Sequence, residues 1–366
     1  MKLLVLTSRY TANRDIIGED FGRQTRLFSA LKKLGHEIDF YVADYRKLEN
    51  KDLRLHGINV KIRAFSVLNF FSFLMSLNHI LKCKKYDAVI ASSDPLWGII
   101  GYIFAKRHNV RFIYDLHDNY ETYASYQIPF FKYIDNFVLT KADLVTAVSH
   151  SLRNKVMPIR EKKVFVVQNG FEAGIFKPKD RLKCRKELKL PINAKIIAYA
   201  GSIQRVQGID LLVDMFNDLK NKIKNLKLAI AGRFVKGEEK YINLDYGGII
   251  YLKSLGQDKV AELINAADVV VVPNPANAFT KYCFPYKVVE YMACNVPIVA
   301  TNVGDTGLFL SKFKDSVCKE NDEKDIAEKI KIQLGKGRVS YRKDAMKNTW
   351  ENIASRFDKV LKENIR

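Results

Sequence analysis

The segment from Phe284 to Ala300 reads FPYKVVEYMACNVPIVA and contains the pattern that decides the fold. Pro285 suits the first position of a helix, because the N–H that proline lacks has no helical partner there. Asn295, two residues before Pro297, is typical of a helix end, and the apolar run that follows suits a buried strand. A helix that passes directly into a buried strand is characteristic of βαβ units. The segment therefore predicts part of a parallel sheet covered by helices.

The same alternation of short apolar runs with longer periodic stretches extends along the chain and predicts an α/β fold. The expected strands are Leu3–Thr7, Ile38–Val42, Ala88–Ala91, Phe112–Leu116, Leu144–Val148 and Val164–Val167, followed by Ile196–Ala200, Leu228–Ala231, Ile249–Leu252, Val269–Val272 and Ile298–Ala300. The expected helices include Asp20–Leu34, Pro95–Arg107, Asp210–Lys222, Asp258–Ala266 and Pro285–Ala293. Turn residues and charges interrupt the pattern near 169–180, so we expect two doubly wound domains, residues 1–175 and 176–341. Ligands of such folds bind outside the carboxyl ends of the strands, which places the expected site in the cleft between the domains.

Composition limits the classes of protein to which the chain can belong. Its 366 residues are 48% hydrophobic and 28% charged, as in folded proteins, and the net charge of +21 favours anionic partners. Nucleic acid, an anionic membrane surface and phosphorylated small molecules all fit that charge, but no zinc spacing or aromatic-rich motif supports nucleic acid. The five cysteines are odd in number and lack a zinc spacing, and no apolar stretch reaches about twenty residues. We therefore expect a cytoplasmic protein without a membrane-spanning helix or a nucleic-acid partner.

The expected helix after Pro285 presents two charges of opposite sign on one face. Lys287 and Glu290 are three residues apart, which is the spacing of neighbours on a helix surface. A lysine near a helix N-terminus suits a phosphate, and the carboxylate can accept two hydroxyl hydrogen bonds from a sugar ring. The alternative is an ordinary salt bridge on a solvated helix.

Residues 285–293 resemble the Pro-x-Lys-x-x-Glu-Tyr-Met-Ala segment of glycosyltransferase family 4, whose members have the GT-B fold. Further segments match the family in order: Leu34-Gly35-His36-Glu37, Asn169-Gly170-Phe171-Glu172, Tyr199-Ala200-Gly201-Ser202, Ala266-Ala267-Asp268-Val269 and Trp350-Glu351. The resemblance covers nearly the whole chain. It implies two Rossmann-like domains that face an interdomain cleft, with a last helix, 342–366, that crosses back onto the first domain. It also implies that Glu290 holds the ribose of a nucleotide-sugar donor.

The resemblance assigns a donor-binding role to a set of residues on both sides of that cleft. They are Gly18, Gly201, Ser202, Arg205, Arg233, Lys287 and Glu290. A glycine after a strand, as at Gly201, lets backbone amides approach a phosphate. For Gly18 the alternative is a plain turn before a helix, and for Arg205 and Arg233 it is a solvated surface cation.

His117 closes the expected strand Phe112–Leu116, where family members carry a histidine near the donor sugar and the acceptor. The resemblance makes it the catalytic candidate, and the alternative is a structural histidine held by its neighbours. Two positions depart from the family, because Gln207 stands where relatives have lysine and Tyr282 where many have glutamate. The Asp-x-Asp motif, with which another glycosyltransferase fold holds a metal, does not occur in the sequence. Relatives with the GT-B fold use basic groups in place of a metal, so we expect no metal and no cofactor.

The resemblance implies a metal-independent, retaining glycosyltransferase of cell-surface polysaccharide or glycolipid synthesis. Its partners would be a nucleoside-diphosphate sugar and a hydroxyl of a glycan or lipid-linked acceptor. Gln207 and Tyr282 leave open a non-catalytic nucleotide-sugar-binding subunit, and an epimerase of the same fold is a third alternative.

Residues 64–81 form an unusually apolar stretch with a narrow stripe of Ser, Asn and His. Basic residues flank it, namely Arg63 before it and Lys82, Lys84 and Lys85 after it. We interpret it as a helix that is covered either by the core of the first domain or by an anionic membrane interface. The second interpretation places the protein peripherally at the inner face of the membrane.

Overall fold

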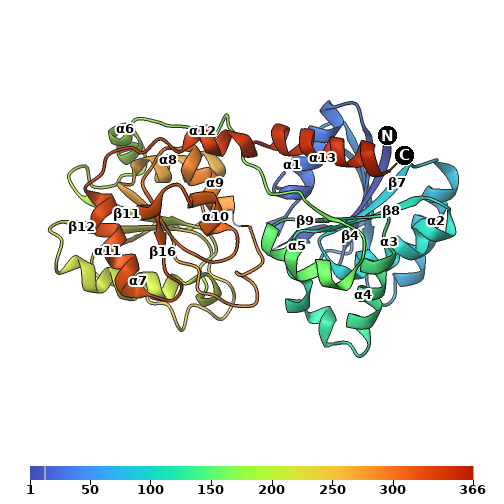
Figure 1. Cartoon of the computed structure of the whole chain (residues 1–366), viewed down its shortest axis with the longest axis horizontal. Helices are drawn as coiled ribbons and strands as arrows, with labels where there is room; N and C mark the ends of the chain where they lie inside the picture. Colours follow the sequence, from blue (N-terminus) through green and yellow to red (C-terminus); the bar gives the residue numbers. More distant parts are fainter. Residues whose placement is uncertain (12–13, 285, 366) are drawn as a thin grey trace. The chain divides into compact units, whose positions relative to one another are not determined.

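The computed structural model describes residues 1–11, 14–284 and 286–365 and divides the chain into two compact units (Figure 1). The N-terminal unit comprises Met1–Asn169 and Trp350–Arg366, and the C-terminal unit comprises Gly170–Thr349. Pro285, which was predicted to open a helix, lies outside the described residues.

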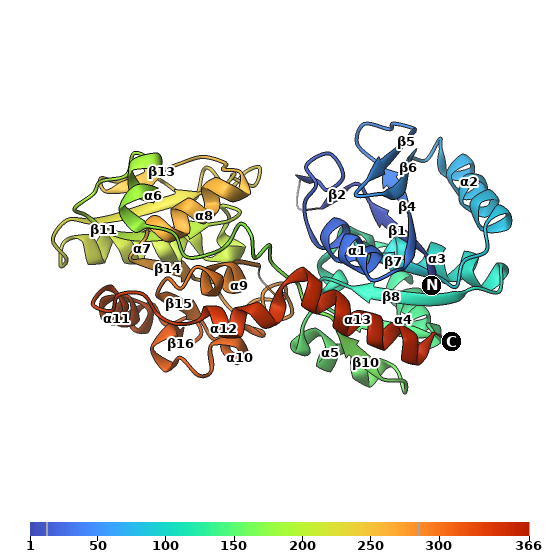
Figure 2. The same ribbon diagram turned by 90° about the horizontal axis from the view of Figure 1, so that it is seen from above.

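The N-terminal unit is built on an eight-stranded sheet with the order β10-β9-β8-β7-β1-β4-β6-β5 (Figure 2). Its strands, with the separate β2–β3 hairpin, are β1 (Lys2–Ser8), β2 (Tyr10–Thr11), β3 (Arg14–Asp15), β4 (Glu37–Asp44), β5 (Lys51–Leu55), β6 (Ile58–Ala64), β7 (Ala88–Ser92), β8 (Arg111–Leu116), β9 (Leu144–Ala147) and β10 (Val164–Val166). All neighbours pair in parallel except β5 with β6. The central strands are buried along nearly their whole length, as their continuous apolar sequences predict.

Helices cover both faces of this sheet. They are α1 (Arg23–Lys33), α2 (Phe70–Cys83), α3 (Pro95–Arg107), α4 (Phe131–Lys141), α5 (His150–Val156) and α13 (Trp350–Asn364), with short 3-10 turns η1 (Tyr120–Thr122), η2 (Ala124–Gln127) and η3 (Met157–Ile159). The last helix, α13, packs against α1, and His36 Nε2 lies 2.8 Å from Asp358 Oδ1 between them. This packing is why the end of the chain belongs to the N-terminal unit.

The C-terminal unit has an all-parallel six-stranded sheet with the order β13-β12-β11-β14-β15-β16. Its strands are β11 (Lys195–Ala200), β12 (Leu226–Ala231), β13 (Ile249–Tyr251), β14 (Val269–Val272), β15 (Ile298–Thr301) and β16 (Val317–Cys318). Its helices are α6 (Arg181–Glu187), α7 (Ile209–Lys220), α8 (Gln257–Ala266), α9 (Tyr286–Ala293), α10 (Thr306–Leu310), α11 (Glu323–Leu334) and α12 (Arg342–Ala345), with η4 (Arg205–Gln207), η5 (Lys314–Ser316) and η6 (Met346–Asn348). The chain runs outward from β11 to β13 and then returns to β14 on the other side of β11. The gap between β11 and β14 is therefore the topological switch point, where ligands of such sheets bind.

The predicted α/β fold of two Rossmann-like units is confirmed, and each expected strand is present. The prediction missed the β5–β6 hairpin, the β2–β3 hairpin and β16. It was also wrong about the start of the apolar helix, because Ala64 is the last residue of β6 and α2 begins only at Phe70.

The structure divides the chain at 169/170 and 349/350, not at the predicted 175/176 and 341/342. Phe171 N donates to Asn348 O over 3.2 Å, which ties the residues just after Asn169 to the C-terminal unit. The Arg342 guanidinium donates to the carbonyls of Phe176 and Ala293, both over 2.8 Å. The segment 342–349 therefore stays with the C-terminal unit, and only α13 returns to the N-terminal one.

Within the described ranges, no helix is both long enough and apolar enough to cross a bilayer. The five cysteines are all free thiols.

Candidate active site

Two glycine turns lie against each other at the carboxyl edge of the C-terminal sheet. Gly201 follows β11, and its N–H donates to Ala231 O over 2.9 Å. Gly232 follows β12, and a Cβ built on it would lie 1.8 Å from Gly201 O. Only glycine fits at position 232, because any side chain there would push the two turns apart.

A third glycine starts helix α7 at the switch point. Gly208 has φ +76°, and a Cβ on it would lie 2.0 Å from Pro273 O, just beyond the end of β14. The close approach places the N-terminus of the twelve-residue helix α7 beside the β11–β14 gap. The first backbone N–H groups of a helix have no helical acceptor and attract anions. This edge of the sheet is therefore suited to a phosphate.

Lys287 on α9 brings a cation to the same place. Its Nζ donates to Tyr199 Oη and to Gln207 Oε1, both over 3.0 Å, and lies 3.2 Å from where a Cβ of Gly201 would be. Both hydrogen-bond partners are neutral. Burial lowers the pKa of the Lys287 ammonium to about 8, since desolvation disfavours its charged form.

Glu290 lies one turn further along α9 and is half-buried. The next residue fixes the helix on the sheet, because Ala200 N, at the end of β11, donates to Tyr291 Oη over 3.0 Å. The structure thus brings α9, with Lys287 and Glu290, to the Gly201 turn within one unit.

The other predicted donor residues of this unit lie on the loops around the turn. Ser202 is exposed, and its carbonyl accepts from Tyr199 Oη over 2.9 Å. Arg233 is also exposed, and its carbonyl accepts from Ile203 N over 2.9 Å. Both positions border the turn through their backbone, whereas their side chains face solvent.

Arg205 has a different environment from the one that the resemblance implies. Its Nε lies 3.3 Å from Glu238 Oε2, and its guanidinium carbon lies 3.6 Å from the centre of the Tyr241 ring. The Arg205 backbone N–H and guanidinium lower the pKa of Glu238. In this structure the Arg205 side chain contacts a carboxylate and an aromatic ring, and its role in donor binding stays a prediction.

His117, the catalytic candidate, follows β8 in the N-terminal unit. Its Nδ1 lies 3.1 Å from Tyr120 Oη, whereas its Nε2 is buried, lies 3.7 Å from Asp118 Oδ2 and has no hydrogen-bond partner. Burial lowers the pKa of His117 to about 4, so the imidazole is neutral at pH 7. Burial also raises the pKa of Asp118 to about 7, and Tyr123 Oη donates to that carboxyl over 3.3 Å.

A buried ion pair positions the strand end that carries His117. Asp115 is fully buried and accepts two hydrogen bonds from the Arg23 guanidinium, over 2.8 and 3.1 Å. Thr146 and Ser92 donate two more, over 2.7 and 3.0 Å. The Arg23 charge and these donors outweigh desolvation and lower the pKa of Asp115. The network fixes β8 against α1, β9 and β7.

Gly18, the remaining predicted donor residue, lies in a turn after β3. Its N–H donates to Asp15 Oδ1 over 2.9 Å, and a Cβ on it would lie 2.8 Å from Asp15 Oδ2. The same carboxylate pairs with the buried Arg9, which also contacts Asp44 and Glu49 over 2.9 and 2.6 Å. The Asp15 carboxylate thus anchors the Gly18 turn, and the role of this turn at the donor phosphates stays a prediction.

Comparison with known proteins agrees with this architecture. Residues 180–363 match the family described as Glycosyl transferases group 1, and residues 25–173 match Glycosyltransferase Family 4. The first match alone covers half of the chain. The chain belongs to the glycosyl transferases group 1 family. The predicted resemblance is confirmed, and the protein is a glycosyltransferase.

This glycosyltransferase is similar to individual known proteins at low sequence identity. The capsular polysaccharide biosynthesis glycosyltransferase CapM of Staphylococcus aureus is 25% identical over 372 residues, covering 91% of this chain and 93% of CapM. The lipopolysaccharide 1,2-N-acetylglucosaminetransferase of Salmonella typhimurium is 28% identical, covering 54% of this chain and 56% of that enzyme. The crystal structure of Anabaena Alr3699/HepE in complex with UDP matches with a TM-score of 0.78 and 17% identity, covering 99% and 100% of the two chains.

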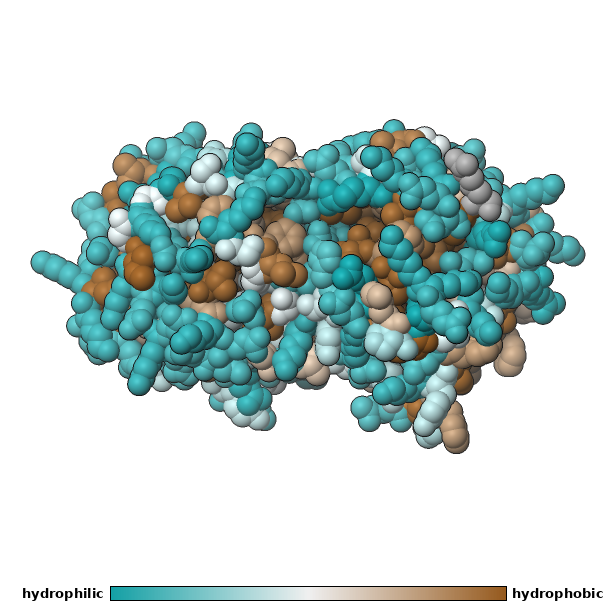
Figure 3. All heavy atoms as spheres, viewed as in Figure 1, coloured by the Kyte–Doolittle hydropathy of each residue, from teal (hydrophilic) through white to brown (hydrophobic). Residues whose placement is uncertain are grey.

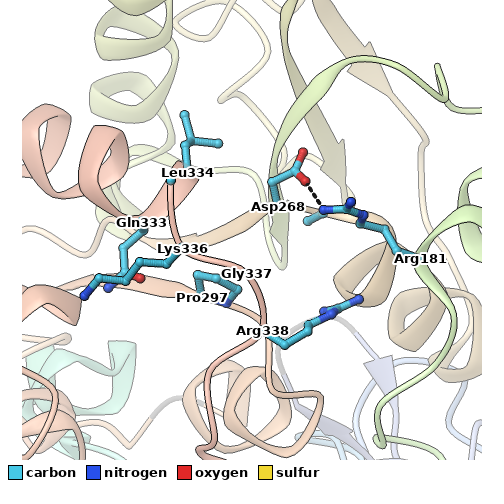
Figure 4. A pocket seen from close by; sticks show the side chains of 10 residues that line it. Arg181, Asp268, Pro297, Gln333, Leu334, Lys336, Gly337 and Arg338 are labelled. Carbon is cyan, nitrogen blue, oxygen red and sulfur yellow. Dashed lines mark hydrogen bonds and ion pairs between the residues drawn. The ribbon is translucent and has the colours of Figure 1, made fainter.

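A cavity of about 490 Å³ lies elsewhere in the C-terminal unit of this glycosyltransferase (Figure 4). It is lined by Arg181, Asp268, Pro297 and the segment 333–338, among others. Asp268 and Pro297 come directly before β14 and β15, so the cavity is at the amino edge of the sheet. It is therefore distinct from the glycine turns at the carboxyl edge.

Sequence reasoning missed the two neutral groups that hold Lys287. Gln207 was visible as a departure from the lysine of relatives, but the sequence does not show that the Lys287 ammonium reaches it. Tyr199 belongs to a segment that matches the family, but the sequence does not show that its hydroxyl meets the Lys287 ammonium. The Arg23–Asp115 pair was also missed, since neither residue belongs to a recognised motif.

Proposed function

We propose that this glycosyltransferase transfers a sugar from a nucleoside-diphosphate sugar to a hydroxyl of a glycan or lipid-linked acceptor in cell-surface polysaccharide or glycolipid synthesis. The observation that carries the proposal is the Lys287 ammonium, which lies beside the Gly201 turn with neutral hydrogen-bond partners. A partly desolvated cation at a glycine turn and a helix N-terminus is a site for a diphosphate.

The donor's nucleotide would be held by groups of one unit. The amides of the Gly201 turn, the N-terminus of α7 and Lys287 would bind the diphosphate, and Glu290 would accept hydrogen bonds from the ribose hydroxyls. In this proposal Lys287, which relatives with the Pro-x-Lys segment share, supplies the cation at the diphosphate, and the Gln207 amide orients it. Gln207 thus has a role beside the proposed diphosphate although it carries no charge.

We propose that the transfer needs no metal ion and retains the anomeric configuration. The support is the positive charge that the protein itself supplies, from the Lys287 ammonium beside the Gly201 turn and from the backbone N–H groups at the start of α7. The acceptor oxygen would attack the face from which the diphosphate departs. The departing phosphate oxygen would take the acceptor proton, and His117 Nε2, which has no partner in the structure, would bond a sugar hydroxyl.

A thermal-shift panel of UDP, GDP and ADP tests the donor site. UDP is the first choice, because it is bound in the structurally similar HepE complex. A ligand present at a hundred times its dissociation constant adds about 2.7 kcal/mol of stability. We expect one of the three diphosphates to raise the melting temperature, and no shift with any of them would contradict the proposed site.

The pKa of Lys287 makes donor affinity depend on pH. Only the protonated ammonium attracts the diphosphate, and its pKa is about 8, so the affinity is highest below pH 8 and falls as the pH rises. The fall should approach tenfold per pH unit. The check is the dissociation constant of the nucleoside diphosphate between pH 7 and 9.5. Lys287→Arg is the matched control, because arginine keeps its charge over this range and should give a flat profile. The same slope in both proteins would show that another group titrates.

A further inference from the structure

Three helices form one layer on a single face of the N-terminal sheet. The chain passes from β6 through β7 and β8 to β9 in one direction along the sheet, and right-handed crossovers then place α2, α3 and α4 on the same face (Figures 1 and 2). The Phe73 and Trp97 rings, from α2 and α3, have centres 5.7 Å apart. Tyr102 and Phe137, from α3 and α4, have centres 6.0 Å apart. These contacts make α2, α3 and α4 a continuous surface, here called the α2–α4 layer.

The inward side of α2 is already filled. Its buried residues are Phe73, Leu77, Ile80 and Leu81. The remaining apolar residues of α2 are half-buried or exposed, so the core covers one side of the helix only. The membrane interpretation of the apolar stretch stays a prediction.

The outward side of the α2–α4 layer exposes large apolar side chains. The loop before α2 exposes Val67 and Leu68 by more than nine-tenths, and α2 exposes Phe71 by 75% and Met75 by 67%. Other exposed apolar residues on and beside the layer are Ile103, Ile128, Phe130, Tyr133, Ile134 and Phe137. Brown atoms lie at the surface of this part of the molecule in Figure 3. Apolar side chains clustered in this way mark an interaction surface.

The exposed charged residues of the three helices are all basic. The three helices contain a single acidic residue, Asp135, which is buried and accepts hydrogen bonds from Tyr114 Oη and Tyr126 Oη. Their exposed basic residues are Lys82, Lys106, Arg107, Lys132 and Lys141. Two of these residues form ion pairs: Lys106 Nζ lies 3.9 Å from an Asp143 carboxylate oxygen, and Lys132 Nζ lies 3.6 Å from one of Glu121. The other three keep the layer positive.

We propose that the α2–α4 layer docks on an anionic lipid bilayer, with Val67, Leu68, Phe71 and Met75 inserted below the headgroups. Aliphatic and aromatic side chains ringed by Lys and Arg match the acyl boundary and the anionic headgroups of such a surface. A second copy of the chain fits less well, because a symmetric dimer through this layer would bring two sets of like charges together. Docking would also favour a lipid-linked acceptor; this consequence alone rests on the proposed function.

Vesicle flotation of the full-length protein tests the proposal, with phosphatidylglycerol–phosphatidylcholine vesicles against phosphatidylcholine alone. We expect binding to the anionic vesicles that weakens with added salt. The double variant Phe71→Ser/Met75→Ser should lose at least about tenfold in affinity. Lys82→Gln/Arg107→Gln should lose about 25-fold at low salt, or about fivefold for each charge.

Matched controls come from the C-terminal unit. Leu308→Ser/Ile332→Ser removes exposed apolar side chains there, and Lys331→Gln/Lys343→Gln removes exposed charges there. The controls should bind vesicles like the unchanged protein. Phe71 and Met75 are mostly exposed, so their replacement should leave the circular dichroism spectrum and nucleotide binding unchanged.

Three outcomes would overturn the proposal. One is no difference between anionic and neutral vesicles at low salt, and another is an equal loss of binding in the control variants. The third is a dimer in size-exclusion chromatography that Phe71→Ser/Met75→Ser abolishes, without vesicle binding by the unchanged protein. That result would assign the layer to a second copy of the chain. Because nucleotide binding is measured separately, failure of the membrane surface and failure of the donor site are distinguishable.

Discussion

Glu290→Ala is expected to weaken binding of the nucleoside diphosphate by about 1.5–3 kcal/mol, which is roughly tenfold to a hundredfold. The carboxylate lies one helical turn from Lys287 on α9. In the proposed site it accepts hydrogen bonds from two neighbouring ribose hydroxyls. Its removal would leave both hydroxyls without a charged acceptor. Titration calorimetry with the diphosphate found in the thermal-shift panel measures the loss.

The matched control is Glu328→Ala, which removes an exposed carboxylate from α11 of the same unit. It changes the net charge by the same amount and should leave the dissociation constant unchanged. An unaltered affinity in Glu290→Ala, or an equal loss in both variants, would remove Glu290 from the donor site. The 2′-deoxy nucleotide offers a further check. The unchanged protein should bind it more weakly than the nucleotide with both hydroxyls, whereas the Glu290→Ala variant should bind the two nucleotides equally.

Gly232→Ala is expected to lower the free energy of unfolding of the C-terminal unit by about 3 kcal/mol. The added Cβ would lie 1.8 Å from Gly201 O, so the two turns would have to separate and the bond from Gly201 N to Ala231 O would be strained. A unit of this size should melt about 6–12 °C lower. Nucleotide binding should weaken in parallel, because the Gly201 turn moves.

Gly247→Ala provides the control for this substitution. A Cβ at Gly247 meets no atom within 4 Å, and its φ is not in the left-handed region. That variant should be as stable as the unchanged protein or slightly more stable, because alanine restricts the unfolded chain. Equal melting temperatures for Gly232→Ala and Gly247→Ala would show that the Gly201 and Gly232 turns can accommodate a Cβ at position 232, contrary to this prediction.

The fold could be predicted because each buried strand is recognisable from its own few residues. Continuous Val- and Ile-rich runs such as Val269–Val272 identify parallel strands wherever they occur. The β5–β6 hairpin was missed because the charged positions of β6 interrupt its apolar run. In the structure these positions belong to a strict alternation of buried and half-buried residues. Strand β5 is mostly exposed and carries no apolar pattern.

The candidate site could be predicted only in part. A glycine turn and the Lys287–Glu290 spacing are visible in the sequence, but the partners of a side chain are set by tertiary packing. Lys287 bonds residues that are eighty and eighty-eight positions away. The contacts of the Arg205 side chain with Glu238 and Tyr241 likewise join residues more than thirty positions apart. The unit boundary was displaced for the same reason, since the Arg342 side chain reaches back to Phe176 and Ala173.

Turnover of the donor tests the central claim most directly. The purified protein is incubated with the preferred nucleoside-diphosphate sugar, with water as the only acceptor, and early products are followed by proton NMR. The account predicts slow release of the nucleoside diphosphate and a first-formed sugar with the anomeric configuration of the donor, both suppressed in Lys287→Met. A first-formed sugar of inverted configuration would contradict retention. A protein that binds the nucleotide but turns over no donor would be a binding subunit, and the transfer proposed for the groups around Gly201 would be wrong.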